Sequence, residues 1–205
     1  MNENVYMHAI NKYSMDDQIV TFFEIVKDGA ILSLRNRGES SSDSFSGLDY
    51  ISLCDYEKKS LAPKTDKYYN AYNVFIRYGI TFAFPKDAIE IIKPKIYIVQ
   101  NDYLFNKKMM KYMGNFEERY SDFLDEVQTK DRISLDSLEY ITFPTRMYFN
   151  KEMTFSRSLK CKMLKNRIEE IKSILNYFNY DVDIYDIDSK IKLDEEGIIR
   201  LIYKK

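Results

Sequence analysis

Apolar runs and a helical repeat alternate over the first part of the chain. Residues 5–10 read Val-Tyr-Met-His-Ala-Ile, and this run of β-branched and aromatic side chains predicts a strand. Ser14 is a suitable N-cap for a helix that follows, and Gly29 predicts where that helix ends. Between them, apolar residues recur at the i, i+3, i+4 and i+7 spacing of an amphipathic helix, at Ile19, Phe22, Phe23 and Val26.

A polar, serine-rich stretch from 35 to 46 separates this unit from the next apolar runs and predicts a surface loop. The later runs are short and rich in β-branched and aromatic residues, and glycine or proline bounds several of them, which is typical of strands. They predict strands at 47–53, 79–84, 95–99 and 138–143, a further strand beside Glu126, and a short helix at 102–113.

The pattern changes to a long amphipathic helix at 155–178. Its apolar stripe consists of Met163, Leu164, Ile168, Ile171, Leu175 and Phe178. We therefore expect an α+β fold in which a sheet-forming domain spans residues 1–144 and a C-terminal helical appendage, residues 145–205, packs on it.

Charge is balanced over the whole chain but not along it. The 31 basic and 32 acidic side chains leave a formal net charge of −1, so no global field attracts nucleic acid or an anionic membrane. Basic residues nevertheless predominate from 144 to 177, and acidic residues predominate from 181 to 196. This asymmetry indicates either a target-binding face or a solvated helix followed by an acidic tail.

The sequence gives little indication of a metal-binding site or of a membrane-spanning segment. Cys54 and Cys161 lie far apart, and with a single histidine the chain offers no ligand set of the usual zinc type. No apolar run approaches the ~18 residues that span a bilayer, and the N-terminus lacks the pattern of a secretory leader. We expect a cytoplasmic protein with no structural metal and no membrane partner.

Three predicted strands carry a chemically interesting residue each, in the chain order His8, Tyr50 and Glu126. Each also has an ordinary structural interpretation. The histidine is compatible with a core position, the tyrosine with an unremarkable strand aromatic, and the glutamate with a charge that protects a sheet edge from aggregation. The functional interpretation therefore depends on the order and spacing of all three residues together.

Three motifs carry a resemblance to a known family. They are Tyr6-Met-His8 followed by a helix and Asp28-Gly-Ala-Ile-Leu-Ser33, the run Phe45-Ser-Gly-Leu-Asp-Tyr-Ile-Ser-Leu53, and the run from Asp125-Glu-Val-Gln to Ile141. In this order they resemble the ADP-ribosyltransferase fold of the diphtheria toxin and poly-ADP-ribose polymerase type, in its His-Tyr-Glu branch. The likeness covers about residues 4–144 and implies a split, mixed or antiparallel sheet with flanking helices.

The resemblance implies that NAD is the cofactor and gives each residue a role. His8 would hydrogen-bond a ribose of NAD, Tyr50 would stack on the nicotinamide ring, and Glu126 would be the catalytic carboxylate at the nicotinamide ribose. The physical chemistry suits these roles, because a carboxylate stabilises positive charge that develops on the ribose. An aromatic face also attracts the cationic pyridinium ring.

Further cofactor contacts are expected nearby. The family pattern has a small hydroxyl residue two positions after the histidine, where this chain has Ile10, so Ser33 or Ser52 would supply that hydroxyl instead. Arg35 and Arg37, beside Gly38, match the bidentate hydrogen-bonding geometry of a pyrophosphate. The alternative for the two arginines is a solvated loop.

The resemblance as a whole implies transfer of ADP-ribose from NAD to a macromolecular acceptor, as in toxin-like transferases. A protein acceptor is slightly favoured over nucleic acid, because the net charge is near zero and the acidic stretch would repel a phosphate backbone. The alternative is a non-catalytic binding or decoy protein, of phage or mobile-element type, that acts through the basic helix Arg157–Lys172. Convergence of His8, Tyr50 and Glu126 on one pocket would favour the enzyme.

Overall fold

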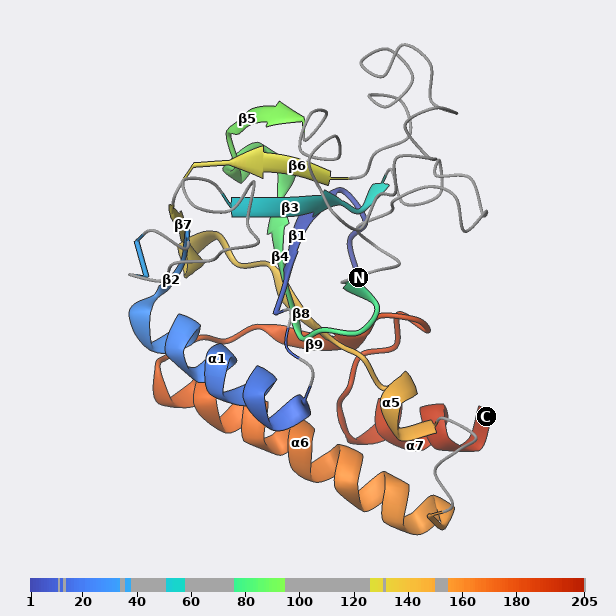
Figure 1. The fold of residues 1–205 in the computed structure, drawn as a ribbon. Helices are drawn as coiled ribbons and strands as arrows, with labels where there is room; N and C mark the ends of the chain where they lie inside the picture. The colour runs from blue at the N-terminus through green and yellow to red at the C-terminus, as the bar shows by residue number, and fades with distance from the viewer. Residues whose placement is uncertain are drawn as a thin grey trace, which may run out of the picture.

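A seven-stranded sheet of order β5-β6-β3-β1-β4-β8-β9 organises the protein (Figure 1). Neighbouring strands are antiparallel except β8 and β9, which are parallel. The computed structural model describes residues 1–10, 12, 14–33, 36–37, 51–57, 76–94, 126–130, 132–149 and 155–204. The strands are β1 (Val5–Ala9), β3 (Ile51–Asp55), β4 (Thr81–Pro85), β5 (Ile91–Pro94), β6 (Glu126–Thr129), β8 (Tyr140–Phe143) and β9 (Asp183–Asp186).

A second, two-stranded sheet and several helices complete the described fold, which confirms the predicted α+β class. The small sheet pairs β2 (Ala30–Leu32) with β7 (Arg132–Ser134) in antiparallel fashion. The helices are α1 (Met15–Asp28), α5 (Arg146–Phe149), α6 (Arg157–Tyr177) and α7 (Glu195–Lys204), with 3-10 turns η3 (Lys86–Ala88) and η4 (Leu135–Ser137).

Helix α1 begins and ends where its capping residues predict. The Ser14 hydroxyl accepts a hydrogen bond from the backbone N–H of Asp17 at 3.0 Å, which satisfies one of the free N–H groups of the first turn. Gly29 adopts a left-handed conformation with φ 63°, and its N–H donates to the Val26 carbonyl. The chain passes from Gly29 directly into β2, so the end of α1 and β2 are held together.

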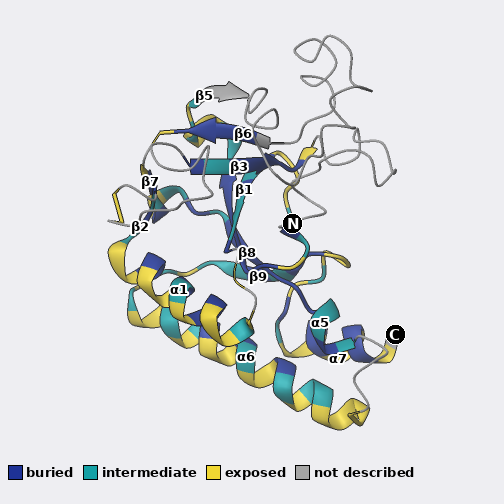
Figure 2. Ribbon diagram, in the orientation of Figure 1, coloured by how far each residue is buried: buried dark blue, intermediate teal, exposed yellow. Residues whose placement is uncertain are grey.

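The two faces of the large sheet bury separate clusters of apolar side chains, as the alternation along a strand requires. Helices α1 and α6 lie side by side and cover one face, where Phe22 stacks on Phe82 of β4 with ring centroids 5.3 Å apart. The other face packs Met7, Cys54 and Ala83 in a smaller cluster. Figure 2 shows the buried strands and the exposed outer sides of both helices.

The C-terminal residues share both the sheet and the core of the rest of the molecule. The long helix predicted at 155–178 is present as α6, and its Leu164 and Ile171 are fully buried in the same cluster as α1. Strand β9 then pairs with β8 in parallel, with Ile184 opposite Ile141. Residues 145–205 therefore contribute a strand to the sheet and are more than a helical appendage.

Several predicted elements differ from the structure or lie outside the described residues. The strand predicted at 47–53 is present from Ile51 onward as β3, and residues 47–50 lie outside the described part of the chain. The strand predicted at 95–99 and the helix predicted at 102–113 fall outside the described residues. Strands β2, β5, β7 and β9 and helix α7 were not expected. Within the described ranges no helix is long and apolar enough to cross a bilayer.

We expect Gly197→Ala to destabilise the fold. A Cβ at Gly197 would lie 1.8 Å from the backbone oxygen of Lys192, so the backbone must shift to accept even the smallest side chain. Overpacking of this kind costs about 1–3 kcal/mol, measurable as the free energy of unfolding in urea. The control is Glu196→Ala at the exposed neighbouring position, where we expect a change below about 0.5 kcal/mol. Equal stability of the two variants would contradict the close approach.

Candidate functional site

The candidate site is centred on His8, in the central strand β1. The Nδ1 atom of its imidazole lies 3.0 Å from the backbone oxygen of Ser52 on the neighbouring strand β3. Because a carbonyl oxygen can only accept a hydrogen bond, Nδ1 carries the proton and donates it. In the neutral ring the other nitrogen, Nε2, then holds a lone pair that can accept a hydrogen bond from a ligand.

The surroundings of His8 favour the neutral imidazole. Burial lowers the pKa of His8 below its ordinary value of 6.5, and the positive charge of Arg37 lowers it further, whereas the hydrogen bond to Ser52 acts in the opposite direction. The ring is partly accessible, although protein surrounds it on most sides. His8 is therefore an oriented, uncharged group at neutral pH.

A pocket of about 500 Å³ opens beside His8, within the usual range for small-molecule sites. Its walls are the second half of α1, strand β2 and the residues Asn36 and Arg37. The turn at Gly29 brings these walls together, because it folds β2 back against the end of the helix.

The charged side chains of the His8 pocket have both signs. Lys27 and Arg37 are cationic, and Glu24 and Asp28 are anionic. Cationic side chains can bind a phosphate or pyrophosphate, and carboxylates can accept hydrogen bonds from sugar hydroxyls. The pocket is therefore suited to a ligand that carries both phosphates and hydroxyl groups.

Ser52 contributes to the site through its backbone. Its carbonyl fixes His8, but its neighbours Ile51 and Leu53 point into the cluster beneath α1 and α6. Since successive side chains of a strand point to opposite faces, the Ser52 hydroxyl belongs to the other face of the sheet. The cofactor contact predicted for this hydroxyl thus has no support in its position, and the residue acts as the holder of His8.

Glu126 is the first residue of β6, two strands away from His8. The register pairs Glu126 with Cys54 of β3, and Cys54 with Met7 of β1. Neighbouring strands lie ~4.8 Å apart, which places the Glu126 backbone about 10 Å from β1. The Glu126 position is therefore in register with Met7 and not with His8. Because successive positions of a strand belong to opposite faces of the sheet, the register assigns the Glu126 position and His8 to opposite faces.

Of the remaining predicted site residues, one lies at the pocket and two lie outside the described part of the chain. Arg37 lines the His8 pocket. Tyr50 directly precedes β3 but lies outside the described residues, and so does Arg35. The structure therefore brings together His8, Ser52 and Arg37 and leaves the relation of Tyr50 to them undescribed.

Helix α1 supplies pocket residues that the sequence did not single out. Glu24, Lys27 and Asp28 lie on its polar side, which in the sequence is indistinguishable from an ordinary solvated helix face. The only available signal was the glycine stop at Gly29 followed at once by an apolar run, which places the last turn of the helix next to the following strand.

The basic helix α6 is largely paired with acidic neighbours over its central turns. Lys165 forms ion pairs with Glu169 and Glu195, and Arg167 forms ion pairs with Asp16 and Glu170. Lys172 donates a hydrogen bond to the Leu193 carbonyl. This pairing weakens the alternative in which α6 is an uncompensated basic surface for a partner.

Comparison of the chain with protein-family models, with curated proteins and with solved structures finds no match. Among the described residues, no group of three or more His, Cys, Asp or Glu side chains is arranged to hold a metal ion. The interpretation of the site therefore rests on its own residues and geometry.

The low pKa of His8 predicts a pH dependence of stability. As pH falls through 6.5, the unfolded chain binds a proton that the folded chain does not, so the free energy of unfolding should decrease. For one proton the slope is at most ~1.4 kcal/mol per pH unit. We expect urea denaturation between about pH 7.5 and 5.5 to show a steeper decline in the parent than in His8→Gln. Parallel pH profiles would contradict a buried, neutral His8.

Proposed function

We propose that the protein binds NAD in the His8 pocket and transfers its ADP-ribose to a macromolecular acceptor. The observation that carries the proposal is the strand order β6-β3-β1. Glu126 begins β6, Tyr50 directly precedes β3, and His8 lies on β1, so three segments far apart in sequence become consecutive neighbours. This adjacency supports the resemblance to the His-Tyr-Glu ADP-ribosyltransferases, in which the three residues serve one ligand.

His8 is suited to recognise a ribose. Its Nδ1–H is held by Ser52, which leaves Nε2 to accept a hydrogen bond from a ribose hydroxyl. The neutral ring does not repel the positive nicotinamide ring of NAD, whereas a charged imidazolium would. The depressed pKa of His8 thus serves binding as well as orientation.

The other walls of the pocket match the rest of the dinucleotide. Arg37 and Lys27 supply cationic groups for the pyrophosphate, and Glu24 and Asp28 supply acceptors for sugar hydroxyls. A pocket of about 500 Å³ accommodates a part of NAD. The remainder would extend from His8 across β3 toward β6.

Glu126 is the residue to which we assign the chemical step. The bond between nicotinamide nitrogen and ribose C1′ breaks, nicotinamide departs with the bonding electron pair, and the nucleophile of the acceptor bonds to C1′ and releases a proton. Positive charge develops on the ribose, and a carboxylate stabilises it. Glu126 is in register with Met7 and not with His8, so the assignment requires its carboxylate to reach the ribose around the end of the sheet, at the first residue of β6.

NAD should stabilise the folded protein. A ligand that binds only the folded state adds about 2.7 kcal/mol at a concentration 100-fold above its dissociation constant. We expect a rise in the thermal unfolding midpoint with NAD, and a loss of most of this rise in His8→Ala and in Arg37→Gln, which remove a hydrogen-bond acceptor and a cation from the pocket. Arg132→Gln, at an exposed position of β7, is the matched control. No shift at millimolar NAD would refute the proposal.

Glu126→Gln should separate binding from chemistry. The amide keeps the shape and hydrogen bonding of the side chain but removes the charge, so release of nicotinamide should slow by ~10²-fold or more, while NAD still raises the unfolding midpoint. Glu90→Gln, which changes a carboxylate paired with Lys130 beside β6, controls for a general loss of charge in this region. If both variants turn over at the parental rate, Glu126 has no catalytic role.

A further inference from the structure

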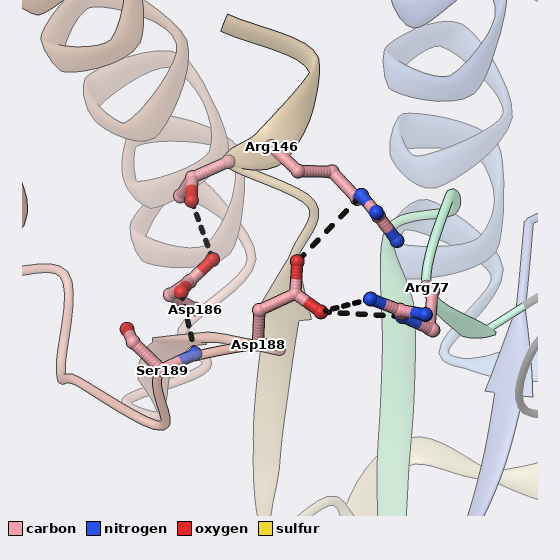
Figure 3. A network of polar contacts seen from close by, with 6 residues as sticks. Arg77, Arg146, Asp186, Asp188 and Ser189 are labelled. Atoms are coloured by element: carbon pink, nitrogen blue, oxygen red, sulfur yellow. Dashed lines mark hydrogen bonds and ion pairs between the residues drawn. The ribbon is translucent and has the colours of Figure 1, made fainter. Parts of the chain in front are cut away.

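A second cluster of polar and aromatic side chains lies away from the His8 pocket, and Figure 3 shows its charged members Arg77, Arg146 and Asp188. It consists of Arg77, Tyr78, Arg146 and Asp188, and we call it the arginine–tyrosine platform. Arg77 donates two hydrogen bonds to one oxygen of Asp188, from Nε at 3.2 Å and from Nη2 at 3.1 Å. The other Asp188 oxygen lies 3.7 Å from Nε of Arg146, whose guanidinium also lies 5.1 Å from the centre of the Tyr78 ring.

The arginine–tyrosine platform has more hydrogen-bond donors than acceptors. Two guanidinium groups share the single carboxylate of Asp188, and each guanidinium carries several N–H groups. Nη1 of Arg146 is buried and has no hydrogen-bond partner among the described residues. A buried donor without an acceptor is costly, so the site gains from a ligand that brings oxygen atoms.

Backbone contacts hold Tyr78 in place. The side chain of Gln18, only 2% exposed, donates from Nε2 to the Tyr78 carbonyl at 3.2 Å and accepts the Ile80 N–H at 2.9 Å. At Gly79, between them, an added Cβ would lie 2.7 Å from the backbone oxygen of Ile10, so this segment lies tightly against the end of β1. These contacts fix the backbone that carries the Tyr78 ring, which lowers the entropic cost of binding a ligand at this position.

The turn that carries Asp188 is anchored as well. Asp186, fully buried, accepts the Thr145 hydroxyl at 2.5 Å and the Ser189 N–H at 2.8 Å (Figure 3). Asp186 and Asp188 together balance the formal charge of the two arginines. The guanidinium N–H groups without an acceptor and the aromatic ring are therefore the groups that the platform offers to a ligand. Because its charges balance, we expect ligand binding to depend only modestly on salt concentration.

We propose that the arginine–tyrosine platform binds a nucleotide, either free or within a single strand of nucleic acid. The guanidinium groups of Arg77 and Arg146 would bind the phosphate, for which their planar donor geometry is suited. Tyr78, which is 50% exposed and has Arg146 over its ring, would stack on the base. The combination of phosphate donors with an adjacent exposed ring distinguishes a nucleotide from an acidic peptide.

The arginine–tyrosine platform is separate from the His8 pocket. The residues that line the His8 pocket include none of Arg77, Tyr78, Arg146 and Asp188. On α1 the nearest of the pocket residues, Thr21, is three residues from Gln18, the residue that holds Tyr78, or ~4.5 Å along the helix. The inference therefore stands on its own contacts, whether or not NAD binds at His8.

Fluorescence anisotropy with a labelled single-stranded oligonucleotide of ~12 nucleotides tests the inference. We expect saturable binding by the parent chain, about tenfold weaker binding by Tyr78→Ala and by Arg146→Gln, and near-parental binding by Tyr78→Phe, which keeps the ring. Tyr177→Ala, at a 78% exposed tyrosine on α6, and Arg132→Gln on β7 are the matched controls. Competition with unlabelled AMP identifies the source of the ligand, because full displacement means that a free nucleotide suffices.

Several results would overturn the inference. One is the absence of binding of the oligonucleotide and of AMP at low salt. Another is equal binding of the oligonucleotide by the parent, Tyr78→Ala and Arg146→Gln. A third is equal affinity for a duplex of the same sequence, whose bases are already stacked. Unfolding midpoints of all variants are compared first, so that a folding defect is recognised. Because NAD is itself a nucleotide, its stabilisation of the parent is compared with that of Arg37→Gln and Arg146→Gln: a rise lost only in Arg37→Gln belongs to the His8 pocket, and one lost only in Arg146→Gln belongs to the platform.

Discussion

Strand β1 is hydrogen-bonded on both edges, to β3 and to β4, and this double pairing fixes the geometry of the molecule. Its odd-numbered residues Val5 and Met7 are fully buried in the smaller core, while Tyr6 and Ile10 pack against the cluster under α1 and α6. A shift of register by one residue would exchange the two sets of side chains between faces. His8 is therefore held at a defined depth, next to a carbonyl that fixes its tautomer.

Local signals in the sequence predicted the helices best. The Ser14 cap, the Gly29 stop and the apolar stripe of 155–178 act within one or two turns, so the pattern alone locates α1 and α6. Strands β2 and β7 were missed because each has three residues and gains its stability from a partner about a hundred residues away. Strand β9 was not predicted because its first and last residues, Asp183 and Asp186, are acidic, and because its apolar Ile184 is buried only when β9 pairs with β8.

The same limit applies to the candidate site. The sequence indicated His8 and Arg37, because a lone histidine in an apolar run and an arginine in a glycine-bounded loop are visible as residue types. It could not indicate the Ser52 carbonyl, since every residue has one, nor the face of the sheet to which the Ser52 hydroxyl belongs, since that depends on how β3 packs in the fold. The register that separates Glu126 from the His8 row is equally a long-range property.

The chain has one histidine, so the imidazole nitrogens of His8 can be observed without interference from others. The most direct test is a long-range ¹H–¹⁵N correlation spectrum of the protein at neutral pH, recorded with and without NAD. The account predicts a neutral ring protonated at Nδ1, and a change in the Nε2 resonance when NAD binds. A charged ring, the opposite tautomer, or a spectrum that saturating NAD leaves unchanged would contradict a ligand site built on His8.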